Sequence, residues 1–386
     1  MRYCNRKKKY FVLCILSLML TGCWDSRDVE KISLVIATAY DEVEKGEGQE
    51  DLLMLTNQIL VPQASNGNKS TAQKPYYNVS VTGNSINQMT REFASKVDYP
   101  IFGQHLKLVV LSDRVAKRKN IQKVLNLYLR DEELRRSCIV VIAKGRASEV
   151  LEAGKNTNIP AERILNISSN GFATTRIIPQ IGIGKVSSYF TAGRSFLLQS
   201  VETNKKNVKF AGAAVIEGKT KKLLGFLNQK EVDGVSWIKG QGMNGVLTTR
   251  DTTTKALVVY GIDTIHSKVT PFVKGDDISF HINITSEGKP SEDWFETGDV
   301  LRNEKLLKKI EKSLAQKVEG IVNESIRVAQ EEYKVDILGF DDVLRIHFPR
   351  VWEKIKENWD QQFSKATVKY NVKINIHDFG TKGSKK

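Results

Sequence analysis

The sequence predicts an α+β protein of several domains, with a mixed α/β region in the N-terminal half and an antiparallel sheet packed with long helices in the C-terminal half. The N-terminal half alternates short β-branched runs with segments of helical period. From Ile278 to Thr285 apolar and polar residues alternate, which is typical of an antiparallel strand with one wet face. Segment 300–332 repeats apolar residues at helical spacing. A chain of 386 residues is long enough for two or three domains.

The N-terminal half begins with three predicted strands. Residues 33–40 and 52–61 are joined by an acidic, glycine-containing stretch that predicts a hairpin loop. A third strand is expected at 76–81, after a polar loop. Ser85 then offers an N-cap to a helix. The apolar face of that helix carries Ile86, Met89, Phe93 and Val97.

The rest of the N-terminal half is predicted to continue the alternation of strands and helices. The expected elements are a strand at 105–111, a helix at 120–130, a strand at 137–143 and a short helix that ends at Gly154. Segment 156–200 has weak periodicity. The N-terminal domain is therefore expected to span residues 23–203, with a split into two subdomains near residue 155 as one alternative.

The C-terminal domain is expected to span residues 208–386, after a linker at 204–207. It begins with a predicted hairpin, in which "VKFAGAAVI" and "KKLLGFL" flank a turn at 217–220. A helix carrying Val232 and Trp237 follows, and then strands at 256–266 and 278–285.

The last third of the chain is predicted to be mostly helical before a closing strand. The long helix places Ile310, Leu314, Val318 and Ile321 on one face. A further helix contains Trp352 and Trp359. The apolar row of the closing strand is Val368, Tyr370, Val372, Ile374 and Ile376.

Residues 1–22 have the anatomy of a signal peptide. A basic stretch from Arg2 to Lys9 precedes a largely apolar run, residues 10–20. A transmembrane helix needs roughly 18–20 apolar residues. Asp25 comes too early for such a span. We therefore expect residues 1–22 to be removed and the mature protein to be exported.

Cys23 is the predicted point of membrane attachment. The stretch Leu20-Thr21-Gly22-Cys23 resembles the bacterial lipobox, in which small residues precede an acceptor cysteine. Its thiol would take an S-diacylglycerol group and its new amino terminus an N-acyl chain. Several acyl chains hold a protein on a bilayer far more firmly than one chain does. The alternative is an ordinary signal peptide in which the cysteine is incidental.

The net charge and the cysteine content bear on which partners the protein binds and on whether disulfides hold its fold. A formal net charge of +15 is typical of proteins that bind nucleic acid or an anionic membrane, and also of a solvated, lysine-rich surface. Because the mature protein is expected to be exported, nucleic acid is not an expected partner. The mature chain keeps only Cys23 and Cys138. The β-branched surroundings of Cys138 predict a buried, inert thiol, so no disulfide framework is expected.

No catalytic, cofactor or metal site is predicted. "GIGK" at 182–185 lacks the P-loop spacing, because Pro179 stands where the first glycine is needed. The pairs at 276–277 and 341–342, all aspartates, lie where turns or helix starts are expected, and capping accounts for them. A pair of carboxylates distant in sequence stays open as a hydrolytic site. The histidines lack metal-ligand spacing; they are His105, His266, His281, His347 and His377.

Several stretches together resemble the Ger(x)C family of spore germination lipoproteins. They are "GCWDSRDVEKISLVIATAYD" (22–41), "FGQHLKLVVLSDRVAKRKNIQKVLNLYLRDEELRRSCIVVIAKGRASEVLE" (102–152), "KKLLGFLNQKEVDGVSWIKGQGMNGVL" (221–247) and "GFDDVLRIHFPRVWEKIKENWDQQFSKATVKYNVKINIHDFG" (339–380). One departure is "ATAYD", where family members more often carry residues like Gly-Ile-Gly-Asp. The resemblance covers nearly the whole mature chain.

The resemblance implies a non-enzymatic lipoprotein subunit of a nutrient germinant receptor, on the outer face of the spore inner membrane. Its partners would be the two membrane-embedded receptor subunits, one with large soluble domains and one resembling a transporter, together with the bilayer that holds its acyl anchor. It would serve as a scaffold or coupling module in the germination response. The implied fold is multi-domain α+β.

Two other functions remain as alternatives. An extracytoplasmic solute-binding lipoprotein would capture a small germinant itself, but such proteins usually have two lobes with parallel sheets. A cell-wall hydrolase would need a convergent acidic pair or a metal site in a cleft.

Overall fold

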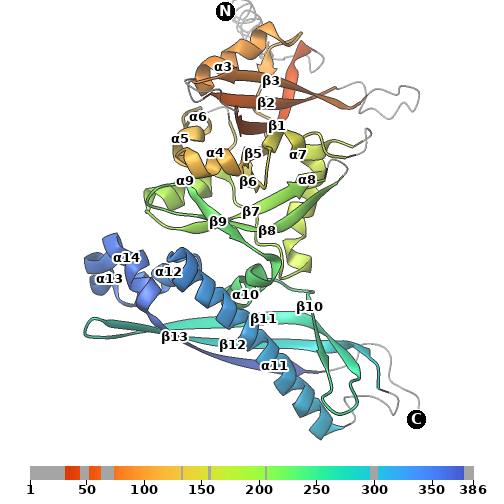
Figure 1. Ribbon diagram of the computed structural model, residues 1–386, viewed down its shortest axis with the longest axis vertical. Helices are drawn as coiled ribbons and strands as arrows, with labels where there is room; N and C mark the ends of the chain where they lie inside the picture. The colour runs from red at the N-terminus through yellow and green to blue at the C-terminus, as the bar shows by residue number, and fades with distance from the viewer. Residues whose placement is uncertain are drawn as a thin grey trace, which may run out of the picture.

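The protein is built around two β-sheets that follow one another along its longest axis (Figure 1). The computed structural model describes residues 31–43, 52–61, 74–131, 134–154, 158–204, 207–295 and 303–377. Cys23 and the predicted signal peptide lie outside these residues. Among the described residues, no helix is long and apolar enough to cross a membrane.

The first sheet has nine strands in the order β3-β2-β1-β5-β6-β7-β8-β9, with β4 paired to β1. The strands β1, β5, β6 and β7 run parallel, and antiparallel strands extend the sheet on both sides. Their bounds are β1 Ser33–Glu42, β2 Leu53–Leu60, β3 Tyr76–Gly83, β4 Ile101–Phe102, β5 Leu108–Ser112, β6 Ile139–Ala143, β7 Phe196–Thr203, β8 Val208–Ile216 and β9 Leu223–Leu227.

Helices cover both faces of this sheet, and each face has its own apolar core. Residues of five helices share a core on one face: α3 Ile86–Glu92, α4 Asp113–Arg118, α5 Ile121–Val124, α6 Asn126–Arg130 and α9 Ile183–Thr191. The core on the other face contains residues of α7 Ala147–Val150 and α8 Pro160–Ser168. The segment after residue 155 therefore shares one sheet and both cores with the segment before it.

The hairpin expected to open the C-terminal half pairs with the first sheet. β7 and β8 pair antiparallel, so the expected linker at 204–207 is the connection of a β-hairpin, with Asn204 N bonded to Asn207 O at 3.2 Å. β9 then pairs with β8. A short polar stretch between two apolar runs has the same composition in a linker and in a hairpin turn, which is why the sequence did not separate them.

The second sheet has four strands in the order β10-β11-β12-β13. The first three are antiparallel, as expected, but β13 runs parallel to β12. The connection between β12 and β13 contains helices, and such a long crossover can bring the chain back in the same direction. The elements are β10 Val246–Arg250, β11 Leu257–Lys274, β12 Asp277–Asp293, β13 Thr367–Ile376, α11 Glu304–Arg327, α12 Phe340–His347, α13 Pro349–Ile355 and α14 Trp359–Lys365.

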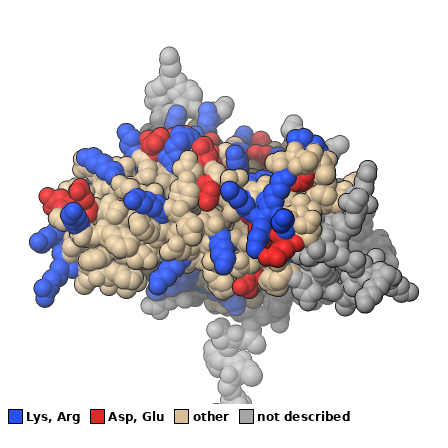
Figure 2. Space-filling view, turned by 90° about the horizontal axis from the view of Figure 1, so that it is seen from below, with Lys and Arg blue, Asp and Glu red and all other residues tan. Residues whose placement is uncertain are grey.

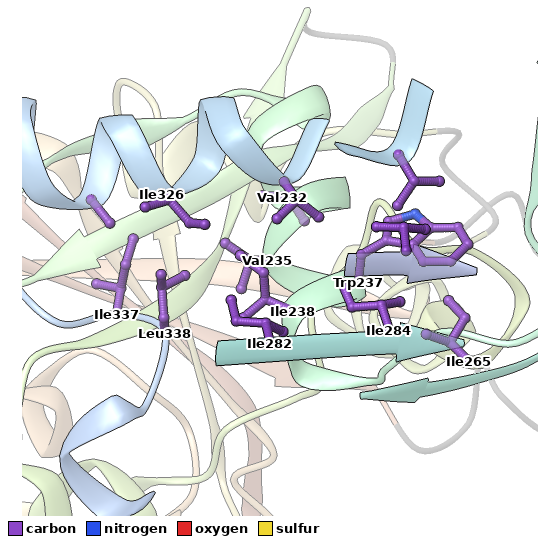
Figure 3. Packing of buried hydrophobic residues seen from close by; sticks show 14 of the residues in the cluster. Val232, Val235, Trp237, Ile238, Ile265, Ile282, Ile284, Ile326, Ile337 and Leu338 are labelled. Carbon is purple, nitrogen blue, oxygen red and sulfur yellow. The ribbon is translucent and has the colours of Figure 1, made fainter. Parts of the chain in front are cut away.

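The helix α10 (Gln229–Lys239) lies between the two sheets and is buried along most of its length. Asn228 and Glu231 form a capping box at its start, and Gly240 ends it in the left-handed conformation. Its apolar side chains pack against Ile282 and Ile284 of β12 (Figure 3). Trp237, predicted from the sequence only as part of a helix, is fully buried in this core.

The crossing of α10 and α11 depends on a glycine. A Cβ atom placed on Gly234 would lie 2.5 Å from the carbonyl oxygen of Ile321 and would overlap the Ser325 hydroxyl. The two helices are therefore closer at this point than any larger residue permits. The Ser325 hydroxyl also donates a hydrogen bond to the Glu231 carbonyl oxygen at 2.8 Å.

We predict that Gly234→Ala lowers the free energy of unfolding by about 1–3 kcal/mol, the usual cost of overpacking. Gly320→Ala in α11 is the matched control, because a Cβ there meets no atom within 4 Å. In an open helix the same exchange stabilises by up to about 1 kcal/mol. Denaturant unfolding measures both, and equal effects at the two positions would contradict the close crossing.

Candidate functional site

A cluster of charged side chains joins the two halves of the protein. Arg194 and Ser195 come from the turn that links α9 to β7 in the first sheet. Asp336, Asp341 and Asp360 come from the loop before α12, from α12 and from α14, which belong to the second half. We call these five residues, with Asp342, the junction cluster.

Arg194 is the cation of the junction cluster. Its Nη2 donates to Asp341 Oδ1 at 2.7 Å, and its Nη1 lies 2.7 Å from Asp342 Oδ2. The guanidinium also lies over the ring of Tyr189, with 5.5 Å between Cζ and the ring centroid. The Arg194 side chain is 21% exposed and that of Asp341 is 5% exposed, so water screens this pair only weakly.

Asp336 organises the backbone around the cluster. Its Oδ1 accepts hydrogen bonds from the amides of Leu338 and Gly339, at 3.0 and 2.8 Å. Its Oδ2 accepts from the amide of Asp341 at 2.7 Å and from Nε1 of Trp359 at 2.9 Å. One buried carboxylate thus fixes the start of α12 relative to α14.

A second path of hydrogen bonds crosses the junction through Ser195. The Gly218 amide, in the turn between β8 and β9, donates to Ser195 Oγ at 3.1 Å. Ser195 Oγ in turn donates to Asp360 Oδ2 at 3.4 Å, and Asp360 Oδ1 accepts from the Asp336 amide at 3.0 Å. A movement of one half against the other would break both this path and the Arg194 ion pairs.

The junction carboxylates differ in pKa because their surroundings differ. Burial, with the charge of Asp336 added, raises the pKa of Asp341 to about 7. Burial also raises the pKa of Asp360. Burial opposes ionisation of Asp342 too, but the hydrogen bond and the charge of Arg194 outweigh it and lower the pKa of Asp342.

The junction cluster leaves little room for a ligand. The cavity among its side chains measures about 40 Å³, enough for one or two waters but far below the 300 Å³ or more of typical small-molecule sites. Within the described residues, no group of three or more His, Cys, Asp or Glu could hold a metal ion. The side chains of the cluster therefore contact one another and hold the two halves in one arrangement.

The structure places the residues singled out in the sequence in different surroundings. Cys138 is buried, and burial raises the pKa of its thiol, which keeps it in the unreactive form. Asp276 and Asp277 lie at the turn between β11 and β12, as expected. The pair at 341–342 does more than cap a helix, because both aspartates bind Arg194. Arg194 and Asp341 are 147 residues apart in the sequence, and no local sequence pattern predicts such a contact.

Comparison with known proteins identifies the family. Residues 25–203 match the family described as "Spore germination protein N-terminal domain", and residues 211–380 match "Spore germination B3/ GerAC like, C-terminal". The chain belongs to the Ger(x)C family of spore germination proteins. Together the two matches cover most of the chain.

Individual members of the Ger(x)C family are similar over nearly their whole length. "Spore germination protein YndF" of Bacillus subtilis (strain 168) is 38% identical, with 96% of each chain covered. "Spore germination protein B3" of the same organism is 30% identical, covering 97% of this chain and 98% of that protein. The crystal structure of the GerBC protein covers 91% of this chain and 100% of that chain, with 26% identity and a TM-score of 0.62. The multi-domain α+β fold predicted from the sequence is confirmed by this match.

We predict that Arg194→Ala lowers the free energy of unfolding by about 3 kcal/mol, because it leaves a buried carboxylate without its cation. Arg345→Ala is the matched control. Arg345 also pairs with Asp342, at 3.2 Å, but its side chain is 54% exposed, and such surface pairs contribute only about 0–1 kcal/mol. Denaturant unfolding at about pH 8.5, above the pKa of Asp341, separates the two, and equal losses would contradict the special role of Arg194.

The junction cluster also predicts a pH dependence. Because the pKa of Asp341 is raised to about 7 in the folded protein, the folded state holds a proton that the unfolded chain has released above about pH 4. The stability that Asp341 contributes is present at low pH and is lost as the pH rises towards 7.

Asp341→Asn should therefore flatten the decline in the free energy of unfolding from about pH 5 to about pH 7.5. Asp342→Asn is the control, since the pKa of Asp342 is lowered and lies below this window. Urea unfolding at several pH values measures the slope. An unchanged slope in the Asp341 variant would refute the raised pKa.

Proposed function

We propose that this chain is the lipid-anchored C subunit of a spore nutrient germinant receptor. The observation that carries the proposal is the match of both halves to spore germination families, with relatives named as spore germination proteins over nearly their full length. The subunit lies on the outer face of the spore inner membrane. It is required for the germination response and acts without catalysis.

The anchor of this subunit is Cys23, which carries an S-diacylglycerol group and an N-acyl chain, palmitate among its acyl groups. Support comes from the signal-peptide anatomy of residues 1–22 and from the lipobox that ends at Cys23. From Cys23 to Lys31, where the described structure begins, are eight residues. Fully extended, they reach at most about 28 Å. The anchor therefore ties the end of the molecule that holds β1 to the bilayer.

The subunit acts as a scaffold or coupling module for the two membrane-embedded receptor subunits. The junction cluster supports this role, because it links two sheets through buried charges while its cavity is too small for a germinant. A module that transmits a signal needs a defined relation between its halves, and a buried ion pair supplies directionality that apolar packing alone lacks.

Cys23→Ala tests the anchor. We expect the variant protein to move from the membrane fraction to the soluble fraction of spores, and nutrient-triggered germination to slow, because without acyl chains the chain has no covalent hold on the bilayer. Cys138→Ala is the matched control and should remain membrane-bound, since Cys138 is buried in the first sheet. Immunoblots of spore fractions and the optical-density loss of germinating spores give the readouts. Normal germination with soluble protein would refute the proposal.

A further inference from the structure

The second sheet has one face that no described element covers. Helices α10, α11 and α14 pack on its inner face, where Phe280, Ile282 and Ile284 of β12 are buried. The alternate residues of the same strands form the outer face, which is the one that Figure 2 shows from below. This face is broad, because β11 and β12 are 18 and 17 residues long.

The outer face is basic. In the paired register, Lys268 lies opposite Asn283 and Asn371, while the next rows bring Lys369 and Lys373 of β13 beside His281 and Thr285 of β12. Lys268, Lys369 and Lys373 are exposed, and none of them forms an ion pair with a carboxylate in the part of the chain that the structure describes. Glu287 is the acidic residue among these rows. Figure 2 shows lysine and arginine spread over the underside of the molecule, with patches of acidic side chains between them.

A groove with an aromatic side chain lies at one end of this basic face. It is a hollow of about 860 Å³ where β13 begins, lined among others by Phe272 and His281, by Lys274, Lys365 and Lys369, and by Asp276 and Asp277 at its β11–β12 turn. Phe272 is 47% exposed. Its ring packs on that of His281, with 4.7 Å between the ring centroids. An exposed aromatic ring held in place beside a groove is the usual anchor of a protein–protein interface, with polar residues as its rim.

With the proposed anchor at Cys23, the basic face lies beyond the reach of the tether to the bilayer. The strands stack from β1 through β5, β6, β7 and β8 to β9, with α10 and the second sheet beyond them (Figure 1). Five strand spacings of about 4.8 Å and a helix layer of about 10 Å separate β1 from the second sheet, roughly 34 Å in all. The eight-residue tether reaches at most about 28 Å. The outer face cannot lie flat on the same membrane, so its lysines do not serve to bind that lipid surface.

We propose that the outer face of the second sheet docks a partner protein through an acidic segment that carries an apolar side chain. The carboxylates of the segment pair with Lys268, Lys369 and Lys373, and its apolar side chain enters the groove against Phe272. Charge complementarity between the two surfaces speeds the encounter and sets the orientation, while the aromatic anchor provides most of the affinity. This inference rests on the proposed anchoring, which decides the direction in which the face points.

The test uses the full chain with Cys23→Ser, so that it is free of lipid, and a fluorescein-labelled peptide in which glutamates flank one phenylalanine. Fluorescence anisotropy measures binding at low and at physiological ionic strength. We expect binding that weakens with salt. The triple variant Lys268→Glu, Lys369→Glu, Lys373→Glu should bind about tenfold more weakly or worse, and Phe272→Ala should weaken binding at both ionic strengths.

The matched control reverses three exposed lysines of α10 and α11, on the other side of the sheet: Lys230→Glu, Lys305→Glu and Lys312→Glu. This control variant changes the net charge by the same amount as the first triple variant. Its affinity for the peptide should stay within about twofold of that of the protein with unaltered lysines. Equal weakening in both triple variants, or no binding at all, overturns the proposal. So does stronger binding of vesicles containing phosphatidylglycerol than of the peptide, if it depends on the same three lysines. Because these measurements need no anchor, their failure is distinct from a failure of the Cys23→Ala test.

Discussion

The helix α10 is the element on which the rest of the architecture depends. It is buried between the edge of the first sheet and the inner face of the second, and it crosses α11 at Gly234 with no room for a side chain. Its ends are fixed by a capping box and by a left-handed glycine, so its position is set by hydrogen bonds as well as by packing. Both sheets therefore keep one relation to this helix.

The junction cluster adds charge to this apolar contact. Apolar packing is non-directional, whereas the bonds of Arg194 and Asp336 hold only in one arrangement of the two halves. The cost is the burial of several carboxylates, which appears as raised pKa values at Asp341 and Asp360.

Local sequence patterns predicted most of the helices and strands, but they did not predict which strands pair or in which direction they run. One face of β12 and one face of α11 are buried, and this burial produces the alternation of β12 and the apolar stripe of α11. The spacing of apolar residues was therefore enough to predict both elements. The hairpin of β8 and β9 was predicted as a hairpin, but its place in the first sheet was not, because its strands are compatible with either sheet and only the pairing with β7 decides. The parallel direction of β13 likewise depends on how the helical crossover packs, which no run of residues encodes locally.

The sequence by itself determined the family, the α+β class and the expectation of a lipid anchor at Cys23, because signal anatomy, period and motifs are properties of contiguous residues. The tertiary structure decided that Arg194 meets the aspartates of α12, and that Lys268, Lys369 and Lys373 share one wet face with Phe272. Those residues come from segments up to about 150 positions apart in the chain. Long-range packing brings them together, and the energy of such contacts depends on distance in space, not in sequence.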